Sequence, residues 1–457
     1  MYRLYYLSKW VENLIMANKT FFVETYGCQM NKSRSEHIAQ VMVQNGYHLI
    51  EDKKRADILL FNTCAVREHA SEKAISNIQK TIKDLNKISR HPIIVIFGCM
   101  SQFLKNRLVQ RVPGAQIVIG TSNIEQIPQY LEEYTRKKKK ILDFNLPSTS
   151  QVFDERGYLR NSSQIFTFLP ITYGCNNFCS YCVVPYTTGP QRSKPLLTIL
   201  KEIEKIIQDG YQEIILLGQN VNSYGLDLGF KNGFEVLLQT IDQNFHDSSI
   251  WIRFLTSHPK DMRPSIVDIV KNSPLMTRYF HLPIQSGSDR ILAAMNRGYT
   301  RDHYMGLVNY IRQTLPDSGI GTDIIIGFPG ETERDFLDTL DIVQEAQFEQ
   351  AYTYIYSSRS GTAAYQLPDQ LPLAEKKKRL QLLNQTLSDI HQIKLKAWVG
   401  KRAKIMIDQI KGLNASGRTT DNQRIFLPNS NLFLGQVISV VVINTLKGKL
   451  YGELVLS

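Results

Sequence analysis

The chain has 457 residues, a length that suggests two or three domains because a single hydrophobic core rarely serves so many. Its hydrophobic fraction of 43% and charged fraction of 21% are typical of a soluble globular protein. No apolar run is long enough to span a membrane, and residues 1–19 lack the apolar core of a signal peptide, so we expect a cytoplasmic protein. The formal net charge of +12 indicates a polyanionic partner.

Residues 1–18 match no element that we expect, and Met16 offers an alternative start, so the translation of residues 1–15 stays open. From Thr20 onward strands alternate with helices, which is typical of an open, mostly parallel α/β sheet. The predicted strands are 21–24, 57–61, 93–97 and 118–120, and the predicted helices are 35–45 and 68–88. We assign this N-terminal domain to residues 19–136.

Three isolated cysteines occupy one kind of position in this domain. Cys28, Cys64 and Cys99 each follow the C-terminal end of a predicted strand. Ligands of open α/β sheets gather in the crevice at these strand ends, so residues far apart in sequence converge there. The alternative is that each cysteine is a small buried hydrophobe. Their equivalent positions favour a shared ligand site.

Two polar stretches follow and are interpreted as a linker. Residues 136–140 are a run of one arginine and four lysines, and residues 147–163 are polar and rich in turn formers. A solvated linker is the first interpretation of the charge run, and a contact with an RNA backbone is the second.

The central motif is Cys175-Asn-Asn-Phe-Cys179-Ser-Tyr-Cys182, a CxxxCxxC triplet with Tyr181 beside its last cysteine. Three thiolates cannot complete a structural zinc site or a fully ligated 4Fe-4S cluster. They can bind three irons of a cubane and leave the fourth iron open to a substrate or cofactor. The alternative, three unrelated buried cysteines, is disfavoured by the close spacing.

From about Ser163 to Lys394, strands and helices alternate again. Six predicted strands have polar C-terminal ends, which suits a (β/α)6 partial barrel with its site on that face. The strands are 166–171, 214–217, 252–255, 281–284, 322–326 and 352–356. We expect cofactor contacts from Tyr181, Gly218, Gln219, Asn220, Gln285 and Ser286. His258 and His281 at strand ends are interpreted as structural or cofactor-positioning residues, not proton carriers. This core is assigned to residues 161–394.

The last segment, residues 396–457, changes character. Nine basic residues face three acids, a net charge of +6. They are Lys396, Lys401, Arg402, Lys404, Lys411, Arg418, Arg424, Lys447 and Lys449, against Asp408, Asp421 and Glu453. Strands predicted at 401–408, 424–427, 437–443 and 450–456 suggest a small antiparallel barrel with 417–419 on a loop. Such a surface can track a phosphate backbone, and a merely solvated face is the alternative.

At these motifs a family resemblance becomes plain. The triplet resembles the signature of radical S-adenosylmethionine (SAM) enzymes, and 171–187 is similar to methylthiotransferases. Gly27-Cys28-Gln-Met-Asn31, Asn62-Thr-Cys64-Ala-Val-Arg-Glu68 and Gly98-Cys99-Met resemble the N-terminal domain of that family. The similarity covers nearly the whole chain from about residue 19. It is closest to the MiaB type, the tRNA 2-methylthio-N6-isopentenyladenosine synthases.

The resemblance implies two 4Fe-4S clusters, SAM as cofactor and a C-terminal TRAM domain that binds RNA. Cys28, Cys64 and Cys99 would hold the auxiliary cluster and Cys175, Cys179 and Cys182 the cluster that cleaves SAM. The reaction would methylthiolate C2 of N6-isopentenyladenosine at position 37 of tRNA, with two SAM molecules. It would also need an electron donor such as flavodoxin or ferredoxin and a sulfur source. We expect a monomer and no catalytic acid or base, because the radical attacks an unactivated C–H bond.

Two departures from the family pattern and two alternatives stay open. Thr188 stands where the family has an arginine, and Ser358, Ser360 and Ala363 replace three prolines. Arg192 or Lys194 is a possible replacement for the missing arginine, and fewer prolines should loosen the second loop. One alternative is a methylthiotransferase with another acceptor, threonylcarbamoyladenosine tRNA or an aspartate of a ribosomal protein. The other is a non-catalytic iron–sulfur RNA-binding protein, which has no need of an open iron.

Overall fold

A computed structural model describes residues 18–65, 68–146, 164–368, 370–428 and 431–455. These residues form two compact units. The first contains the described residues before 160 together with the short pieces Tyr173–Asn176 and Cys182–Arg192, and the second contains the others. The expectations for residues 1–15 and for the polar stretch 147–163, which includes the predicted start of the core, lie outside the described residues.

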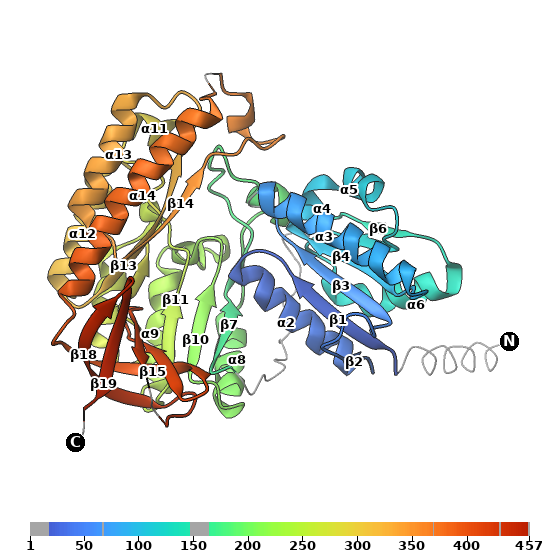
Figure 1. Ribbon diagram of the computed structural model, residues 1–457, viewed down its shortest axis with the longest axis horizontal. Helices are drawn as coiled ribbons and strands as arrows, with labels where there is room; N and C mark the ends of the chain where they lie inside the picture. The colour runs from blue at the N-terminus through green and yellow to red at the C-terminus, as the bar shows by residue number, and fades with distance from the viewer. Residues whose placement is uncertain (1–17, 66–67, 147–163, 369, 429–430, 456–457) are drawn as a thin grey trace. The chain divides into compact units, whose positions relative to one another are not determined.

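The first unit is built on the expected open parallel sheet (Figure 1). All its strand pairs are parallel, in the order β2-β1-β3-β4-β5-β6. The strands are β1 (Thr20–Thr25), β2 (His48–Leu49), β3 (Ile58–Thr63), β4 (Ile93–Gly98), β5 (Ile117–Ile119) and β6 (Ile141–Asp143). The helices are α2 (Gln29–Gln44), α3 (Glu68–Lys87), α4 (Cys99–Leu104), α5 (Asn106–Arg111) and α6 (Ile127–Lys137), with the 3-10 turn η1 (Ile124–Gln126) before α6.

Strand β3 lies in the middle of this sheet and is buried on both faces. Ile58 and Leu60 pack into one hydrophobic core, whereas Leu59 and Phe61 pack into the other, as the alternation of strand side chains requires. A strand buried on both sides by helices is a continuous apolar run, and the run from Ile58 to Phe61 is why the sequence predicted it. The core of the first unit therefore consists of two layers.

The basic run 136–140 ends helix α6 and leads directly into strand β6, so it lies within the first unit and not in a linker. Helix α6 ends at Lys137, Lys138 adopts a left-handed conformation with φ of 52°, and β6 begins at Ile141. Lys137 pairs with Glu133 and the Nζ of Lys140 donates to the carbonyl of Pro113. The interpretation as a linker was wrong because polarity alone does not show that the chain returns to pair a sixth strand.

The second unit contains the six predicted strands as two parallel three-stranded sheets, β11-β10-β7 and β12-β13-β14. They are β7 (Phe166–Pro170), β10 (Glu213–Leu217), β11 (Trp251–Phe254), β12 (Tyr279–His281), β13 (Gly319–Ile326) and β14 (Gln350–Ile355). Backbone hydrogen bonds of Ile252 with Leu275 and Thr277, at 2.8 and 2.9 Å, connect the two sheets. This succession is the expected partial barrel.

Helices and short elements connect these strands. The longer helices are α8 (Leu196–Gln208), α9 (Gly233–Phe245), α10 (Pro264–Asn272), α12 (Arg301–Thr314), α13 (Glu333–Ala346) and α14 (Leu373–Lys396). The shorter elements are β8 (Thr172–Tyr173), α7 (Val184–Thr188), β9 (Arg192–Ser193), η2 (Val221–Ser223), η3 (Leu226–Leu228), η4 (Pro259–Asp261), α11 (Asp289–Ala294) and η5 (Ala363–Gln366).

Strand β12 ends at His281, earlier than the predicted end at residue 284. Pro283 has no N–H to donate to a neighbouring strand, so the ladder stops before it. The N–H of Ile284 instead donates to Oγ1 of Thr322 at 3.0 Å, and Gln285 adopts a φ of 72°. Gln285 nevertheless lies beside β13, because its N–H donates to the carbonyl of Asp323 at 2.9 Å.

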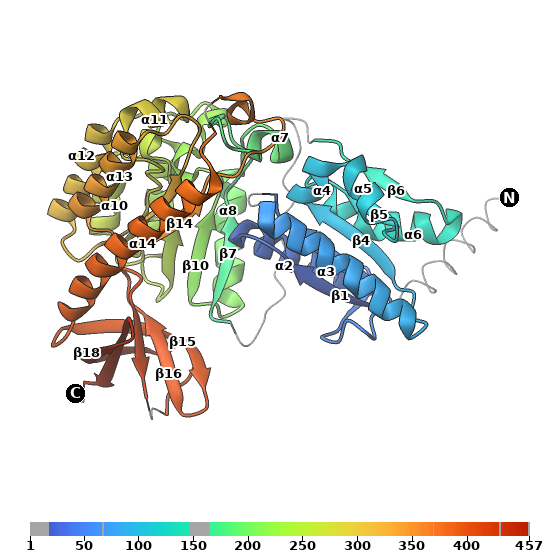
Figure 2. The same ribbon diagram turned by 45° about the horizontal axis from the view of Figure 1, so that its top comes forward.

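The C-terminal residues of the second unit form a closed five-stranded barrel after α14 (Figure 2). Its strands are β15 (Arg402–Lys411), β16 (Asn414–Arg418), β17 (Arg424–Leu427), β18 (Val437–Leu446) and β19 (Lys449–Leu454), in the order β15-β16-β17-β19-β18. The small barrel was expected, but β17 and β19 are parallel and β16 was predicted as a loop. Gly417 on β16 faces the carbonyl of Met406 so closely that a Cβ would lie 2.5 Å from it, which requires a small residue there.

The barrel is joined to the core by a buried network of charges. The carboxylate of Glu213 on β10 accepts from Nε of Arg253 at 2.7 Å and from Nη2 of Arg418 at 2.8 Å. Asp408 of the barrel accepts from both Arg418 and Arg424. The side chains of Glu213 and Arg253 are each 2% exposed, so each buried charge needs the opposite charge of the other residue to compensate for the loss of water. Arg418 is therefore a docking residue and not a loop residue open to RNA.

We expect Glu213→Ala to lower the free energy of unfolding of the second unit by about 3–5 kcal/mol, because it leaves Arg253 buried without its carboxylate. Urea unfolding followed by far-ultraviolet circular dichroism measures the change. The control is Glu204→Ala on the exposed face of α8, which should change the free energy by about 0.5 kcal/mol or less. Equal stability of the two variants would contradict the role of the network.

Candidate functional site

The CxxxCxxC loop lies between β8 and α7 and is shaped by one glycine. Gly174 has a φ of 74°, and a Cβ on it would lie 2.1 Å from the carbonyl oxygen of Pro190. No other residue fits there without moving the backbone. The N–H of Cys175 donates to the carbonyl of Gly189 at 3.3 Å, and the Sγ of Cys182 accepts from the N–H of Val184 at 3.4 Å. The loop is therefore held by its own flanking residues.

Cys179 lies beside a buried arginine that the sequence did not predict. Nη1 of Arg297 donates to the Sγ of Cys179 at 3.3 Å, and the residue is only 5% exposed. Nη2 of Arg297 donates to the carbonyl of Pro283 at 3.0 Å, and its Nε donates to the hydroxyl of Tyr299 at the same distance. A guanidinium fixed in this way stabilises a thiolate, which is the form that binds iron.

His258 lies on the other side of Cys179, with Nε2 4.0 Å from the Sγ. Burial, together with the charges of Arg297 and Lys260, lowers the pKa of His258 to about 2, so the ring is neutral. Nδ1 accepts from the N–H of Lys260 at 3.2 Å, which puts the proton on Nε2, toward the sulfur. This agrees with the interpretation of His258 as a positioning residue.

The buried polar atoms that have no hydrogen-bond partner among the described residues include three that follow strands of the second unit. These three are Oγ1 of Thr172, Oγ of Ser257 and Oε1 of Gln285. Leaving a buried donor or acceptor unpaired is costly, so such atoms indicate a polar ligand. They follow three different strands, β7, β11 and β12. Polar groups such as the amino and carboxylate groups of SAM fit these atoms.

The other predicted cofactor residues fall into two groups. Asn220 and Ser286 already have partners: Nδ2 of Asn220 donates to Asp261 at 2.6 Å, and Oγ of Ser286 accepts from the N–H of Ser288 at 3.3 Å. Oδ1 of Asn220 also accepts from the N–H of His258 at 3.2 Å, so Asn220 fixes the loop that carries His258. These two residues hold the backbone at the site.

Gly218, Gln219 and Tyr181 form the second group of predicted cofactor residues. A Cβ on Gly218 would lie 2.3 Å from Oγ1 of Thr172, so the glycine permits a close approach of two loops. Gln219 follows it and is half-buried. The ring of Tyr181 packs against a cluster that includes Phe328 and Tyr356, and its hydroxyl is 3.5 Å from Nη1 of Arg297. Tyr181 therefore connects the cysteine loop to the buried arginine.

The three isolated cysteines of the first unit follow neighbouring strands. Cys28 precedes α2 after β1, Cys64 follows β3, and Cys99 begins α4 after β4. Because β1, β3 and β4 are adjacent and parallel, these residues lie at one edge of the sheet, as expected. Helix α2 begins at Gln29 and not at residue 35. The sequence prediction missed its first turn because that turn is polar and carries no apolar periodicity.

The surroundings of these cysteines suit thiolate ligands. Gly27 has a φ of 116° and no room for a Cβ, which would lie 2.3 Å from the Cβ of Cys64. A hydrogen bond with Cys64, together with the N–H of Asn31 and the charge of Arg34, lowers the pKa of Cys28 to about 6. Nη1 of Arg34 also donates to the Sγ of Cys99 at 3.4 Å. One buried arginine thus serves two of the cysteines.

The polar neighbours of the cysteines have structural roles. Nδ2 of Asn62 donates to the carbonyl of Asn31 at 2.7 Å and to Oγ of Ser35 at 2.9 Å. Within the described residues, no three Cys, His, Asp or Glu side chains are spaced to hold one metal ion together. A cubane instead spreads its thiolate ligands over different irons, so it tolerates wider spacing than a single ion does.

The structure also locates the two departures from the family pattern. Thr188 is 2% exposed on α7, and Nζ of Lys194 donates to both oxygens of Glu202 at 2.7 Å in a buried pair. Lys194 is therefore committed to this pair and does not replace the missing arginine. In the other loop, Oγ1 of Thr362 donates to the carbonyl of Arg359 at 2.8 Å. The N–H of Ala364 donates to the carbonyl of Ser180 at 2.7 Å, which anchors that loop to the cysteine loop.

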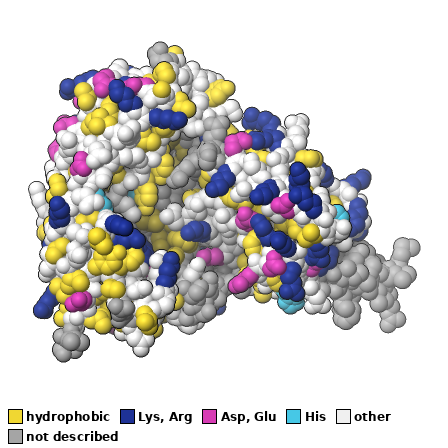
Figure 3. All heavy atoms as spheres, viewed as in Figure 1, with side chains coloured by type: hydrophobic (Ala, Val, Ile, Leu, Met, Phe, Trp, Pro, Cys, Tyr) yellow, Lys and Arg dark blue, Asp and Glu magenta, His cyan; other side chains and the backbone are white. Residues whose placement is uncertain are grey.

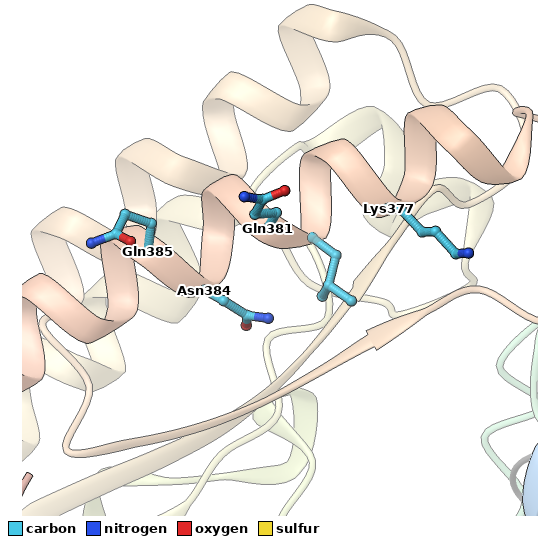
Figure 4. Close-up of a pocket in the computed structure, with 5 residues that line it drawn as sticks. Lys377, Gln381, Asn384 and Gln385 are labelled. Carbon is cyan, nitrogen blue, oxygen red and sulfur yellow. The ribbon is translucent and has the colours of Figure 1, made fainter.

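A hollow of about 410 Å³ lies along α14, away from these residues (Figure 4). It is lined by Lys377, Leu380, Gln381, Asn384 and Gln385, all from one helix. Asn384 accepts a hydrogen bond from Oγ1 of Thr353 on β14 at 2.7 Å. The lining contains none of the predicted site residues, so this hollow is a feature of the helix surface.

The surface carries many basic side chains. Figure 3 shows Lys and Arg side chains spread over the part of the first unit where α3 lies. In the same view, hydrophobic side chains gather over the C-terminal barrel, where Val437, Ile443 and Leu446 are exposed. Among the described helices, none is both long and apolar enough to cross a bilayer.

Two family models match the chain. Residues 20–120 match the uncharacterized protein family UPF0004, and residues 169–343 match the radical SAM superfamily. The first covers the three isolated cysteines and the second covers the CxxxCxxC loop. The two matches agree with the two groups of cysteines described above.

The chain is also similar to curated proteins and to solved structures. It is 39% identical over 443 residues to the tRNA-2-methylthio-N(6)-dimethylallyladenosine synthase of Thermoanaerobacter pseudethanolicus, covering 96% of this chain and 93% of that one. The synthase of the same name from Caldicellulosiruptor saccharolyticus is 40% identical over 442 residues, with the same coverage. The radical SAM methyltransferase TsrM of Kitasatospora setae, solved with cobalamin and a 4Fe-4S cluster, shares the fold with a TM-score of 0.59 at 12% identity, covering 76% and 77% of the two chains.

Proposed function

Because the chain belongs to the family of tRNA-2-methylthio-N(6)-dimethylallyladenosine synthases, we propose that it methylthiolates C2 of N6-isopentenyladenosine at position 37 of tRNA. It is a transferase of the radical SAM superfamily and uses SAM and iron–sulfur clusters. The observation that carries the proposal is the match along 96% of the chain with both groups of cysteines in place. The alternative of a non-catalytic RNA-binding protein is not favoured by any described feature.

The proposed roles of the residues follow from their surroundings. Cys175, Cys179 and Cys182 hold one 4Fe-4S cluster, and Cys28, Cys64 and Cys99 hold the other. When bound, the clusters and SAM supply the 5′-deoxyadenosyl radical and the sulfur that is transferred. Arg297 balances the negative charge of the thiolates around Cys179. Gln285 offers Oε1 to a donor group of SAM, and Asn220 fixes the loop of His258.

The remaining partners follow from the chemistry. One-electron cleavage of SAM needs a reductant such as flavodoxin or ferredoxin, and methylthio transfer needs a sulfur source. We assign the protein to the cytoplasm, where tRNA is modified, and expect it to act as a monomer. Mass spectrometry of bulk tRNA nucleosides from cells with and without the gene tests the proposal. Loss of 2-methylthio-N6-isopentenyladenosine on deletion supports it, and an unchanged level of that nucleoside overturns it.

We also propose that the exposed lysines of the C-terminal barrel contact tRNA phosphates. Lys404, Lys447 and Lys449 are exposed, whereas Arg418 and Arg424 are bound by Asp408. Deletion of the whole barrel would also remove Arg418 from its buried network with Glu213 and so would disturb the core. Point substitutions are therefore a sharper test than truncation.

We expect Lys447→Ala with Lys449→Ala to weaken tRNA binding and to flatten its salt dependence. Each lost phosphate contact lowers the slope of log affinity against log salt by about 0.7–0.9, so the pair should lower it by about 1.4–1.8. The control removes the same charge from the outer helices, Lys201→Ala with Lys271→Ala, both exposed. Filter binding over a range of salt concentrations measures both slopes. Equal slopes for the two double variants would show that the barrel lysines are only solvated.

A further inference from the structure

Strand β14 places tyrosines on one face. Tyr352, Tyr354 and, just after the strand, Tyr356 alternate with Ala351, Thr353 and Ile355, and alternate residues of a strand point to opposite faces. Oγ1 of Thr353 donates to Asn384 of α14 at 2.7 Å, so that side faces the helix (Figure 4). Tyr352 and Tyr354 therefore lie on the face away from α14, whereas Tyr356, beyond the end of the strand, has Nζ of Lys376 of α14 5.2 Å from the centre of its ring.

Tyr352 is the most exposed member of this face. It is 44% exposed, although tyrosine is large and mostly apolar. The edge of its ring lies against His281, with centroids 6.2 Å apart and planes at 73°. It pairs in register with Asp323 of β13, and Asp323 lies 3.5 Å from Nε2 of His281. One side of the ring is thus supported by neighbours, and much of the rest is open.

The two ends of β14 lie near different parts of the second unit. At its start, Oε1 of Gln350 accepts from Nδ2 of Asn422 of the C-terminal barrel at 3.2 Å. Just past its end, Tyr356 packs in the cluster that contains Tyr181 of the cysteine loop. The strand therefore runs from the barrel to the cysteine loop, as Figures 1 and 2 allow the reader to follow. A ligand held on the barrel meets these tyrosines on its way to that loop.

Strand β14 is also an edge strand. In its sheet the order is β12-β13-β14, and among the described strands no other one pairs with β14 on its free side. Of its tyrosines, Tyr352 is exposed and Tyr356 is buried, so the accessible part of the face lies at Tyr352. Side chains on one face of a strand recur every two residues, about 6.6 Å apart. This is a suitable spacing for successive unstacked bases of a single strand.

We propose that the tyrosine face of β14 guides single-stranded RNA from the C-terminal barrel to the cysteine loop, with a nucleobase stacked on Tyr352. Protein surfaces that bind splayed-out bases present aromatic rings next to positive charge. Tyr352 presents the ring, and the positive charge comes from the exposed lysines of the barrel, because the charged neighbour of the ring itself is Asp323. The inference rests on the proposed function, because it takes the anticodon loop of tRNA as the ligand.

The test measures binding of an anticodon stem-loop RNA that carries N6-isopentenyladenosine to the reconstituted holoenzyme, by fluorescence anisotropy. Tyr352→Ala should raise Kd by about 5- to 140-fold, which is the range that base–aromatic stacking gives on alanine substitution. Tyr352→Phe keeps the ring and should bind within about twofold of the wild type, whereas Tyr352→Leu keeps apolar volume without a ring and should bind as weakly as the alanine variant.

The matched control is Tyr310→Ala on helix α12, where the hydroxyl donates to Asp268 at 2.8 Å. It removes a partly buried tyrosine from a helix and should leave the affinity unchanged. Equal affinity of Tyr352→Ala, Tyr352→Leu and the wild type would overturn the inference, as would a loss in Tyr352→Phe equal to that in Tyr352→Ala. If bulk tRNA lacks the methylthio nucleoside in wild-type cells, the proposed function fails, whereas a normal nucleoside with unchanged Tyr352→Ala affinity defeats the guiding role alone.

Discussion

Replacing Cys175, Cys179 and Cys182 together by alanine is expected to abolish formation of 5′-deoxyadenosine from SAM. No other described thiol lies on this loop, so the variant cannot hold the cluster whose open iron would bind SAM. Anaerobically reconstituted wild-type protein should contain about eight irons and the triple variant about four, since each cluster has four irons. Iron determination and chromatography of the SAM cleavage products measure the two effects.

The control for this experiment is the triple alanine variant of Cys28, Cys64 and Cys99, which should lose the same amount of iron and keep the cleavage of SAM. Production of 5′-deoxyadenosine by the Cys175, Cys179 and Cys182 variant would show that the central assignment is wrong. An unchanged iron content would show that the loop binds no cluster.

The second large effect is a separable defect at the auxiliary site. We expect replacement of Cys28, Cys64 and Cys99 by alanine to abolish methylthio transfer to RNA and to leave about four irons. The physical reason is that the three thiols lie at the ends of adjacent strands, that Arg34 donates to the Sγ of Cys99, and that its charge helps to lower the pKa of Cys28. Mass spectrometry of the RNA product and assay of 5′-deoxyadenosine separate the two activities.

A single substitution sharpens this prediction. Gly27→Ala should disturb the auxiliary site without removing a thiol, because its Cβ would lie 2.3 Å from the Cβ of Cys64. We expect less iron and less methylthio product than in the wild type. If Cys64→Ala loses neither iron nor transfer activity, these cysteines are core residues, as a small buried thiol usually is.

Much of the fold could be predicted because its strands have strong local signals. The apolar runs of β3 and β4 are nearly continuous, and each ends in a polar loop that carries a cysteine. The partial barrel and the closed C-terminal barrel were also expected, and the structure confirms them. Strand β16 was missed because Asn414-Ala-Ser-Gly-Arg418 lacks β-branched and aromatic residues, and barrel closure alone makes it a strand.

The residues that surround the cysteines could not be predicted from the sequence. Arg297 is 118 positions from Cys179, and the turn that brings them together depends on α11 and the loop after it. The contact of Arg34 with the cysteines could not be predicted either, because nothing in the sequence distinguishes an arginine on a polar helix turn that faces a thiol from one that faces solvent. The assignment of the six cysteines as cluster ligands stays a prediction. The structure adds the donors that face the sulfurs.

The charge network between Glu213, Arg253 and Arg418 has a consequence for biosynthesis. Domains fold as their residues emerge from the ribosome, from the N-terminus onward. The strands of the partial barrel emerge well before β16. Strand β16 carries Arg418, which follows Glu213 by 205 positions. Until then Glu213 has Arg253 as its partner and lacks the second arginine that the finished protein provides. We therefore expect the nascent core to reach its full stability only when the C-terminal barrel has closed.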